Sequence, residues 1–379
     1  MRIQRSWKLI HRIALVIGSV AMLALVAAPQ IRLAHAEAAP GFYIQTNLVS
    51  DISGLAKVTD PHLLNPWGIV SGPTSPFWIS DNGAGVSTLY NGAGTPFPPG
   101  APLVVNIPAS VSSGDAATGV PTGVVFNGSG DFVVSAAGKS GAAAFIFATE
   151  DGAIAGWNPT VNRNNAIREV DNGPGAVYKG LAIASTQSGA RLFAANFRAG
   201  SVDVFNGHFQ QISTPGGFRD ERIPAGFAPF GIRVIDGKVF VTYAKQNEAK
   251  HDDIAGPGNG FVDVFTANGW LVQRLVAHGA LNSPWGLALA PDNFGAFSNA
   301  LLVGNFGDGH INAYNVHSGA FLGQIRDAAG NPIVIDGLWG LTFGNGATAG
   351  PTTTLFFTAG LNGEADGLFG SLTSSVLNK

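Results

Sequence analysis

Cysteine is absent from this sequence, and charged residues are few. None of the 379 residues is cysteine, and only 12% are Asp, Glu, Lys or Arg. Disulfide bonds are therefore excluded as a source of stability, even for a chain exported to an oxidising compartment. The 46% content of hydrophobic residues is too high for a disordered chain. The sequence thus predicts a folded protein that is stabilised by burial of apolar surface.

Several motifs of common enzymes are also absent. The sequence contains no Gly-x-Ser-x-Gly nucleophile elbow, no His-x-His or His-Glu-x-x-His pair, no phosphate-binding loop and no Asp-rich loop of the EF-hand type. Local sequence therefore gives no support for a serine hydrolase, a zinc enzyme or a nucleotide-binding protein.

Basic residues are scarce outside the first 36 residues. Those 36 residues hold five of the Lys and Arg side chains and no acidic ones, so 16 basic residues face 24 acidic ones in the remainder, a formal charge of −8. A mildly acidic surface without a basic cluster argues against nucleic acid as a partner.

The N-terminus has the three parts of a secretory leader. A basic segment is followed by an apolar run at 13–28, and Ala34-His35-Ala36 forms a small-x-small cleavage site. The run of 16 residues is shorter than the roughly 20 that a spanning helix needs. We therefore expect a signal peptide at 1–36, export of residues 37–379 to the periplasm or the extracellular space, and no membrane span after cleavage.

A glycine followed by an apolar run recurs along the chain. The six glycines stand at positions 68, 123, 180, 231, 286 and 340, at intervals of 51 to 57 residues. Short runs with β-strand composition lie between them, separated by Gly, Pro and Asn turns. A period of this kind is typical of a repeat architecture. We therefore predict an all-β fold: a six-bladed β-propeller of four-stranded blades, formed as one domain by residues 37–379.

The strand count also predicts how the ring closes. The sixth repeat contains runs at 340–343, 354–358 and 368–372 and is one strand short, whereas Phe42–Val49 is a spare strand before the first repeat. We expect the spare strand to complete the last blade and cover an otherwise open edge. In the second repeat, the runs at 123–126, 131–135 and 144–147 are predicted as the first three strands.

One face of the predicted ring collects polar residues. The inner strand of each blade starts at this face and the second strand returns to it, so residues before inner strands and after second strands share one mouth. Lys179 is among the residues placed at this mouth, and the candidate ligand-binding residues chosen there are Asn65, Asn82, Asn196, Asn282, Asn305 and Asp336. An amide-rich rim suits a sugar, another polar small molecule or Ca²⁺. The alternative is that these residues only stabilise turns.

The fourth repeat carries a long charged loop at the same mouth. Residues 245–254 are the densest charged run in the chain, and long loops of compact folds are often functional. Lys245, His251 and Asp252 are candidate acid–base, metal or ligand-binding groups; the alternative is a solvated loop with local salt bridges. The tryptophans that precede three of the repeat glycines, at 67, 285 and 339, are expected to pack between blades and not to stack on a sugar.

Four stretches carry a resemblance to a known family. They lie at 47–51, 64–68, 243–246 and 251–265. Together they resemble a family of exported bacterial propeller proteins, some of which end in an exosortase-type sorting tail. The resemblance covers about 42–375, although the last residues, 371–379, lack the apolar helix and basic tail of such members. The blade pattern is more distantly similar to NHL-type and gluconolactonase-type propellers. The resemblance implies a fold and a compartment, but no activity.

Two functions have support from particular residues at this point, and a third class, a structural or envelope-assembly component, fits only the predicted compartment. The first is a secreted, non-catalytic propeller that binds a polar small molecule or a protein partner at its amide-rich mouth. The second is a lactonase-like or ester hydrolase with Ca²⁺ near the central channel, for which Asp336, Asn65 and Asn282 are the candidate ligands by resemblance. The sequence predicts neither the substrate nor the oligomeric state.

Overall fold

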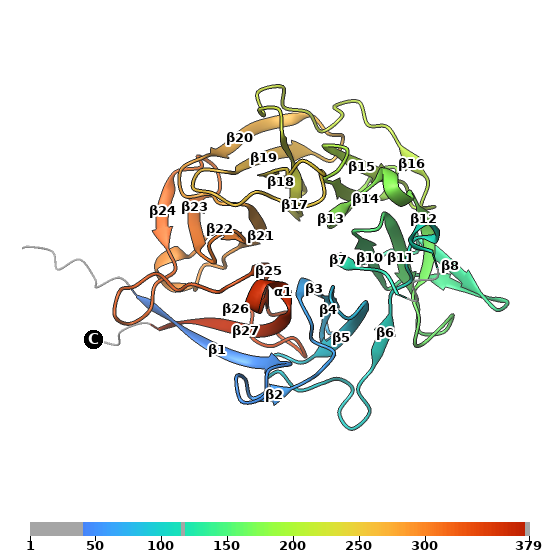
Figure 1. Cartoon of the computed structure of the whole chain (residues 1–379), viewed down its shortest axis with the longest axis horizontal. Helices are drawn as coiled ribbons and strands as arrows, with labels where there is room; N and C mark the ends of the chain where they lie inside the picture. Colours follow the sequence, from blue (N-terminus) through green and yellow to red (C-terminus); the bar gives the residue numbers. More distant parts are fainter. Residues whose placement is uncertain (1–40, 115–117, 376–379) are drawn as a thin grey trace, which may run out of the picture. The chain divides into compact units, whose positions relative to one another are not determined.

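Six antiparallel sheets radiate around a common centre (Figure 1). The computed structural model describes residues 41–114 and 118–375, so the predicted leader at 1–36 lies outside the described residues. Within the described ranges, no helix is long and apolar enough to cross a membrane. The predicted six-bladed β-propeller is confirmed.

Each blade is a four-stranded sheet, and its strands run from the innermost outward in the following order. Blade one contains β3 (Pro66–Ser71), β4 (Phe77–Asp81), β5 (Val86–Tyr90) and β6 (Val104–Asn106), and blade two contains β7 (Pro121–Phe126), β10 (Phe145–Thr149), β11 (Ala153–Trp157) and β12 (Ile167–Asp171). Blade three contains β13 (Tyr178–Thr186), β14 (Gly189–Asn196), β15 (Ser201–Phe205) and β16 (Gln211–Ile212), and blade four contains β17 (Phe227–Ile235), β18 (Lys238–Lys245), β19 (Phe261–Thr266) and β20 (Leu271–Ala277). Blade five contains β21 (Pro284–Leu289), β22 (Ala300–Asn305), β23 (Ile311–Asn315) and β24 (Phe321–Gln324), and blade six contains β25 (Leu338–Phe343), β26 (Thr354–Gly360), β27 (Asp366–Ser375) and β1 (Phe42–Ser50).

The repeat glycines are explained by the close approach of neighbouring inner strands. A Cβ placed on Gly231 would lie 2.1 Å from the carbonyl oxygen of Trp285 in the next blade. A Cβ on Gly340 would lie 2.6 Å from that of Trp67, which continues the pattern from the last blade to the first. Real Cβ atoms do not approach so closely, because interiors are already at close-packed density. Glycine at these positions therefore permits six inner strands to surround a narrow channel.

The N-terminal strand closes the ring as predicted. β1 pairs antiparallel with β27, from Phe42 opposite Ser375 to Ser50 opposite Leu368. A short strand, β2 (Val58–Thr59), adds to the outer edge of β1 in parallel. Figure 1 shows the first strand beside the last one in this blade. The first and last strands of the described chain are thus locked in one sheet.

The predicted strand assignment in blade two was wrong. The run at 131–135 contributes to β8 (Val133–Ala136), which pairs with β9 (Lys139–Ala142) in a separate two-stranded hairpin. The second strand of the blade is β10, in which Phe145 lies opposite Phe126 of β7. Both runs have strand composition, and alternation of apolar residues does not specify which one pairs with the inner strand.

The three repeat tryptophans pack against one another at the channel, across the boundaries between blades. Trp67 and Trp339 stack with ring centroids 3.5 Å apart, and Trp285 meets Trp339 edge-on at 5.6 Å. Phe197 and Phe230 from blades three and four join the same buried cluster. We call these five aromatic residues the aromatic plug. The expectation that the tryptophans pack between blades is confirmed, and Trp67 also meets Trp285 of blade five, which is not a neighbouring blade.

Candidate functional site

A cluster of polar side chains lies at the mouth where the inner strands begin, over the aromatic plug. Its members come from the starts of inner strands, the ends of second strands and the loop between β18 and β19. We call the following residues the mouth cluster: Asn65, Asn82, Glu150, Lys179, His251, Asp252, Asp253 and Glu364.

Lys179 is the centre of the mouth cluster. It is the second residue of β13, and its side chain is only 3% exposed. The ammonium group donates to the carboxylate of Glu150, lies 3.4 Å from Asp252 Oδ1, and is 5.0 Å from the ring centroid of Trp67. Burial of the ammonium lowers the pKa of Lys179. The carboxylates of Glu150 and Asp252 have the larger, opposite effect, so the pKa of Lys179 is raised overall. The amine is therefore held protonated, which removes it as a nucleophile or a general base.

Two of the predicted asparagines extend this network from blade one. Asn65 donates from Nδ2 to Asn82 Oδ1 and to Glu364 Oε1, both at 3.2 Å, and accepts from Trp339 Nε1 at 3.3 Å. Asn82 in turn donates to Glu150 Oε2 at 2.9 Å. The two amides are buried and connect the acids of blades two and six with the aromatic plug.

Glu364 reaches the cluster from an unusual backbone conformation. It ends the short turn α1 (Leu361–Glu364) between β26 and β27, where Asn362, Gly363 and Glu364 have φ values of 54°, 65° and 71°. Positive φ values raise the conformational energy of residues other than glycine, and they tend to occur at functional sites. Burial raises the pKa of Glu364, opposed by the hydrogen bond from Asn65.

The loop between β18 and β19 supplies the remaining acids. His251 Nδ1 lies 2.7 Å from Asp252 Oδ1; His251 is half-buried and Asp252 is exposed. Burial would raise the pKa of Asp252, but the hydrogen bond with His251 and the charge of Lys179 lower it. Burial raises the pKa of the neighbouring Asp253. Two carboxylates thus contact one buried ammonium group and two further carboxyl groups interact with its charge, so acidic groups outnumber the buried amine in the mouth cluster.

Three donors in the cluster lie close enough to share a metal ion. Single ligand atoms of Glu150, His251 and Asp252 are within 4.8 Å of one another. However, the ammonium of Lys179 contacts both of these acids. A divalent cation placed there would lie beside a like charge, so the side chains in this arrangement do not fit Ca²⁺.

The other predicted site residues serve neighbouring loops. Asn196 Oδ1 accepts the N–H groups of Val177 and Ala199. Asn282 accepts from the Gly256 N–H, and Asn305 donates to the Ala280 carbonyl. Their Nδ2 groups also donate to carboxylates, Asn196 to Asp203 at 3.0 Å and Asn282 and Asn305 to Asp308 at 3.2 and 3.0 Å. A role of these three amides in ligand binding stays a prediction.

Two further predicted residues lie outside the mouth cluster. Asp336 is exposed and accepts from the Asn362 N–H. Lys245 is exposed at the end of β18, where its carbonyl accepts from Ile254.

Sequence reasoning missed Glu150, Asp253 and Glu364 as site residues. Glu150 directly follows β10, the true second strand of blade two. The rule that residues after second strands face the mouth would have selected it, had β10 been assigned correctly. Glu364 follows β26 in the same way, but within a turn whose backbone conformation the sequence does not reveal.

Comparisons with known proteins place the chain among viral relatives. No family model matches it. The chain is 31% identical over 336 residues to uncharacterized protein R648 of Acanthamoeba polyphaga mimivirus, an alignment that covers 86% of this chain and 78% of the relative. Uncharacterized protein L690 of the same virus is also 31% identical over 336 residues, covering 86% of this chain and 84% of the relative.

Solved structures are similar to the chain at much lower sequence identity. A protein of unknown function from Bacteroides thetaiotaomicron has a TM-score of 0.54 at 9% identity and covers 88% of this chain and 76% of its own. A streptogramin B lyase has a TM-score of 0.49 at 12% identity, and the match covers 89% of this chain and 98% of the lyase chain. The relatives above are viral and not bacterial, and export and a sorting tail stay predictions. The chain belongs to the family of propeller proteins that includes these two mimivirus proteins.

Proposed function

We propose that this propeller is a non-catalytic binding protein whose mouth cluster takes a polar small molecule carrying an ammonium group. One observation carries the proposal: Glu150 and Asp252 contact the buried ammonium of Lys179, and the carboxyl groups of Asp253 and Glu364 lie near enough to interact with its charge. A cationic ligand would be attracted by the excess negative charge and would favour the ionised forms of Asp253 and Glu364. Export of residues 37–379 belongs to the same proposal and would present the mouth to ligands outside the cell.

Stability alone does not account for such a cluster. Removing several charges from water costs more than a well-packed apolar core of the same volume. The backbone of the turn at Glu364 adds strain. Buried charge and backbone strain both lower stability, and both are typical of sites that bind a ligand.

The experiment is a calorimetric titration of residues 37–379 with three probes: putrescine, glucose and calcium chloride. We expect putrescine to bind, and Glu364→Gln to weaken binding about tenfold or more, because a charge-assisted hydrogen bond contributes roughly 1.5–3 kcal/mol. The glutamine retains an acceptor for Asn65, so the fold should persist. Asp292→Asn, at an exposed site beyond the far end of β21, is the matched control and should bind putrescine as the parent does.

The other outcomes are equally informative. Binding of glucose alone would contradict the requirement for charge. If putrescine, glucose and Ca²⁺ all fail to bind, the mouth cluster has only a structural role and the proposal is wrong.

The second candidate is the Ca²⁺-dependent hydrolase, for which Glu150, His251 and Asp252 are the donors that lie close together. It requires Lys179 to leave the position between Glu150 and Asp252. Binding of Ca²⁺ without putrescine, followed by turnover of a lactone or ester, would favour this candidate and overturn the first.

A further inference from the structure

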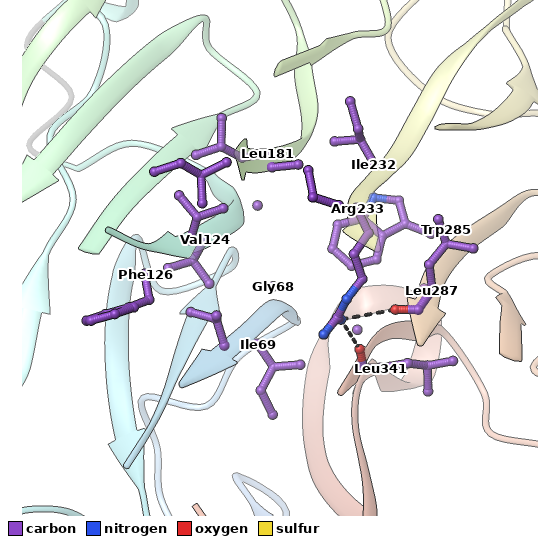
Figure 2. A pocket seen from close by; sticks show the side chains of 18 of the residues that line it. Gly68, Ile69, Val124, Phe126, Leu181, Ile232, Arg233, Trp285, Leu287 and Leu341 are labelled. Carbon is purple, nitrogen blue, oxygen red and sulfur yellow. Dashed lines mark hydrogen bonds between the residues drawn. The ribbon is translucent and has the colours of Figure 1, made fainter. Parts of the chain in front are cut away.

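The central channel contains a cavity on the side of Trp285 away from the mouth cluster. The cavity has a volume of about 300 Å³, is open to solvent, and is lined by all six inner strands. Its walls are formed by residues that follow the repeat glycines, so it extends toward the ends of the inner strands, where Ser71 and Val234 are half-exposed. Figure 2 shows the apolar side chains that line it, which include Ile69, Val124, Leu181, Ile232, Leu287 and Leu341.

One charged side chain enters this apolar cavity. Arg233 lies two residues after a repeat glycine, where the other five repeats have Val70, Val125, Ala182, Ala288 and Thr342. From β17 the guanidinium extends toward β21 and β25 (Figure 2). Nη1 donates to the carbonyl oxygens of Leu287 at 3.0 Å and Leu341 at 2.7 Å, and Nη2 donates to Thr342 Oγ1 at 3.1 Å.

Arg233 has no counterion within the part of the chain that the structure describes. None of the salt bridges there involves it. Burial lowers its pKa to about 10, with no nearby carboxylate to oppose the shift. The three bonds above use three of five N–H donors, which leaves the Nε hydrogen and one Nη2 hydrogen for another acceptor.

A purely structural role explains the bonds of Arg233 but not its remaining donors. As a strut, the guanidinium would connect blades four, five and six through carbonyl oxygens. The channel itself follows from the propeller architecture, but a strut does not need the two N–H donors that remain for an acceptor in the channel. A space of this volume is at the lower end of the range for small-molecule sites, which combine apolar walls with a few fixed polar groups.

We infer that the channel cavity binds a small organic acid, with its carboxylate on the guanidinium of Arg233 and its apolar body against the surrounding aliphatic side chains. Guanidinium groups suit carboxylates because their N–H donors match the two oxygens in a planar fork. This site is separate from the mouth cluster, since the aromatic plug lies between them. The inference about the channel cavity does not depend on the proposed amine site, and the two are tested separately.

The test is a calorimetric titration of residues 37–379 with octanoate and with its uncharged analogue octanamide. We expect octanoate to bind at least tenfold more tightly than octanamide. Arg233→Met should abolish that preference, because it keeps an apolar side chain but removes the charge. Arg326→Met, which removes an exposed arginine from blade five, should leave octanoate binding unchanged.

A second variant keeps the inference testable if Arg233→Met does not fold. Val124→Phe should fill part of the cavity without contacting the mouth, and octanoate binding should fall at least tenfold while the melting temperature stays near that of the parent. No octanoate binding by the parent, equal binding of octanamide, or undiminished octanoate binding by Val124→Phe would overturn the inference.

Discussion

The indole rings of Trp67 and Trp339 stack with their centroids 3.5 Å apart, and they belong to the first and the last blade. The hydroxyl of Thr358 in blade six donates to the Trp67 carbonyl oxygen at 2.5 Å. These contacts hold the start of the first inner strand against the start of the last. The ring is therefore closed at its inner edge as well as by β1 at its outer edge.

Gly231→Ala should destabilise the propeller strongly. The added methyl group would meet the Trp285 carbonyl at 2.1 Å, and overpacking of this kind typically costs about 1–3 kcal/mol or more. The matched control is Gly130→Ala, where a Cβ has nothing within 4 Å. Urea unfolding of both variants measures the effect. Equal unfolding midpoints would show that the inner strands can separate without cost.

Removal of β1 should destabilise the whole ring. A chain that begins at Ser50 lacks Tyr43, Leu48 and Val49, which are almost fully buried. Burial of each side chain contributes about 1.5–3 kcal/mol, a large part of a typical stability of roughly 5–15 kcal/mol. The melting temperature should fall well below that of residues 37–379. A chain that begins at Phe42 serves as the control, and equal melting of the chain beginning at Ser50 would refute closure by this strand.

Lys179→Met should cost about 3–5 kcal/mol, since it leaves the buried carboxylate of Glu150 without its cation. Glu150→Gln in the same chain should restore much of the loss, because both charges are then absent. A double-mutant cycle by urea unfolding measures the coupling. Additive effects of the two substitutions would mean that the pair does not interact in solution.

Asp263 should make the propeller less stable as the pH rises toward neutrality. It lies buried on β19, and burial followed by the charge of Asp220 raises its pKa to about 7, opposed by Arg274. Between the unfolded value near 4 and this value, the folded state holds the proton and the unfolded state has lost it. Stability is therefore greatest below the unfolded pKa and falls by up to about 1.4 kcal/mol per pH unit as the pH rises through the folded pKa.

Asp263→Asn isolates that contribution. The free energy of unfolding of the parent and the variant should be compared at pH 4.5 and pH 7.5. The parent should lose more stability over this interval than Asp263→Asn does. Parallel pH profiles would show that Asp263 titrates alike in both states.

The fold could be predicted from the sequence because its signal is repeated six times. The glycine period sets the blade number, and the spare strand before Trp67 balances the missing strand after Gly340. The strand assignment in blade two was wrong because two runs of similar composition follow β7. Only their pairing in the folded protein distinguishes β8 from β10. That error concealed Glu150, which directly follows β10.

The candidate site was less accessible to sequence reasoning. Asn65 and Asn82 were selected by their place before and after strands, and they do join the mouth cluster. Asn196, Asn282 and Asn305 occupy equivalent places, yet their amides bond to loop backbone and to the carboxylates of Asp203 or Asp308 and do not join the mouth cluster. Composition cannot separate these roles, because asparagine suits both turns and ligand sites. The burial of Lys179 and the left-handed backbone of Glu364 arise only from the assembled ring.

The most direct test of the amine site uses the tryptophan indole signals as local reporters. Nitrogen-15 labelling of tryptophan in residues 37–379 gives one indole N–H signal for each of six residues. Trp67 and Trp339 lie beneath the mouth cluster, whereas Trp270 is 57% exposed beside the outer strand of blade four. Addition of putrescine should shift the signals of Trp67 and Trp339 in a saturable way and leave Trp270 in place. Unmoved signals, or an equal shift of Trp270, would contradict binding at the mouth.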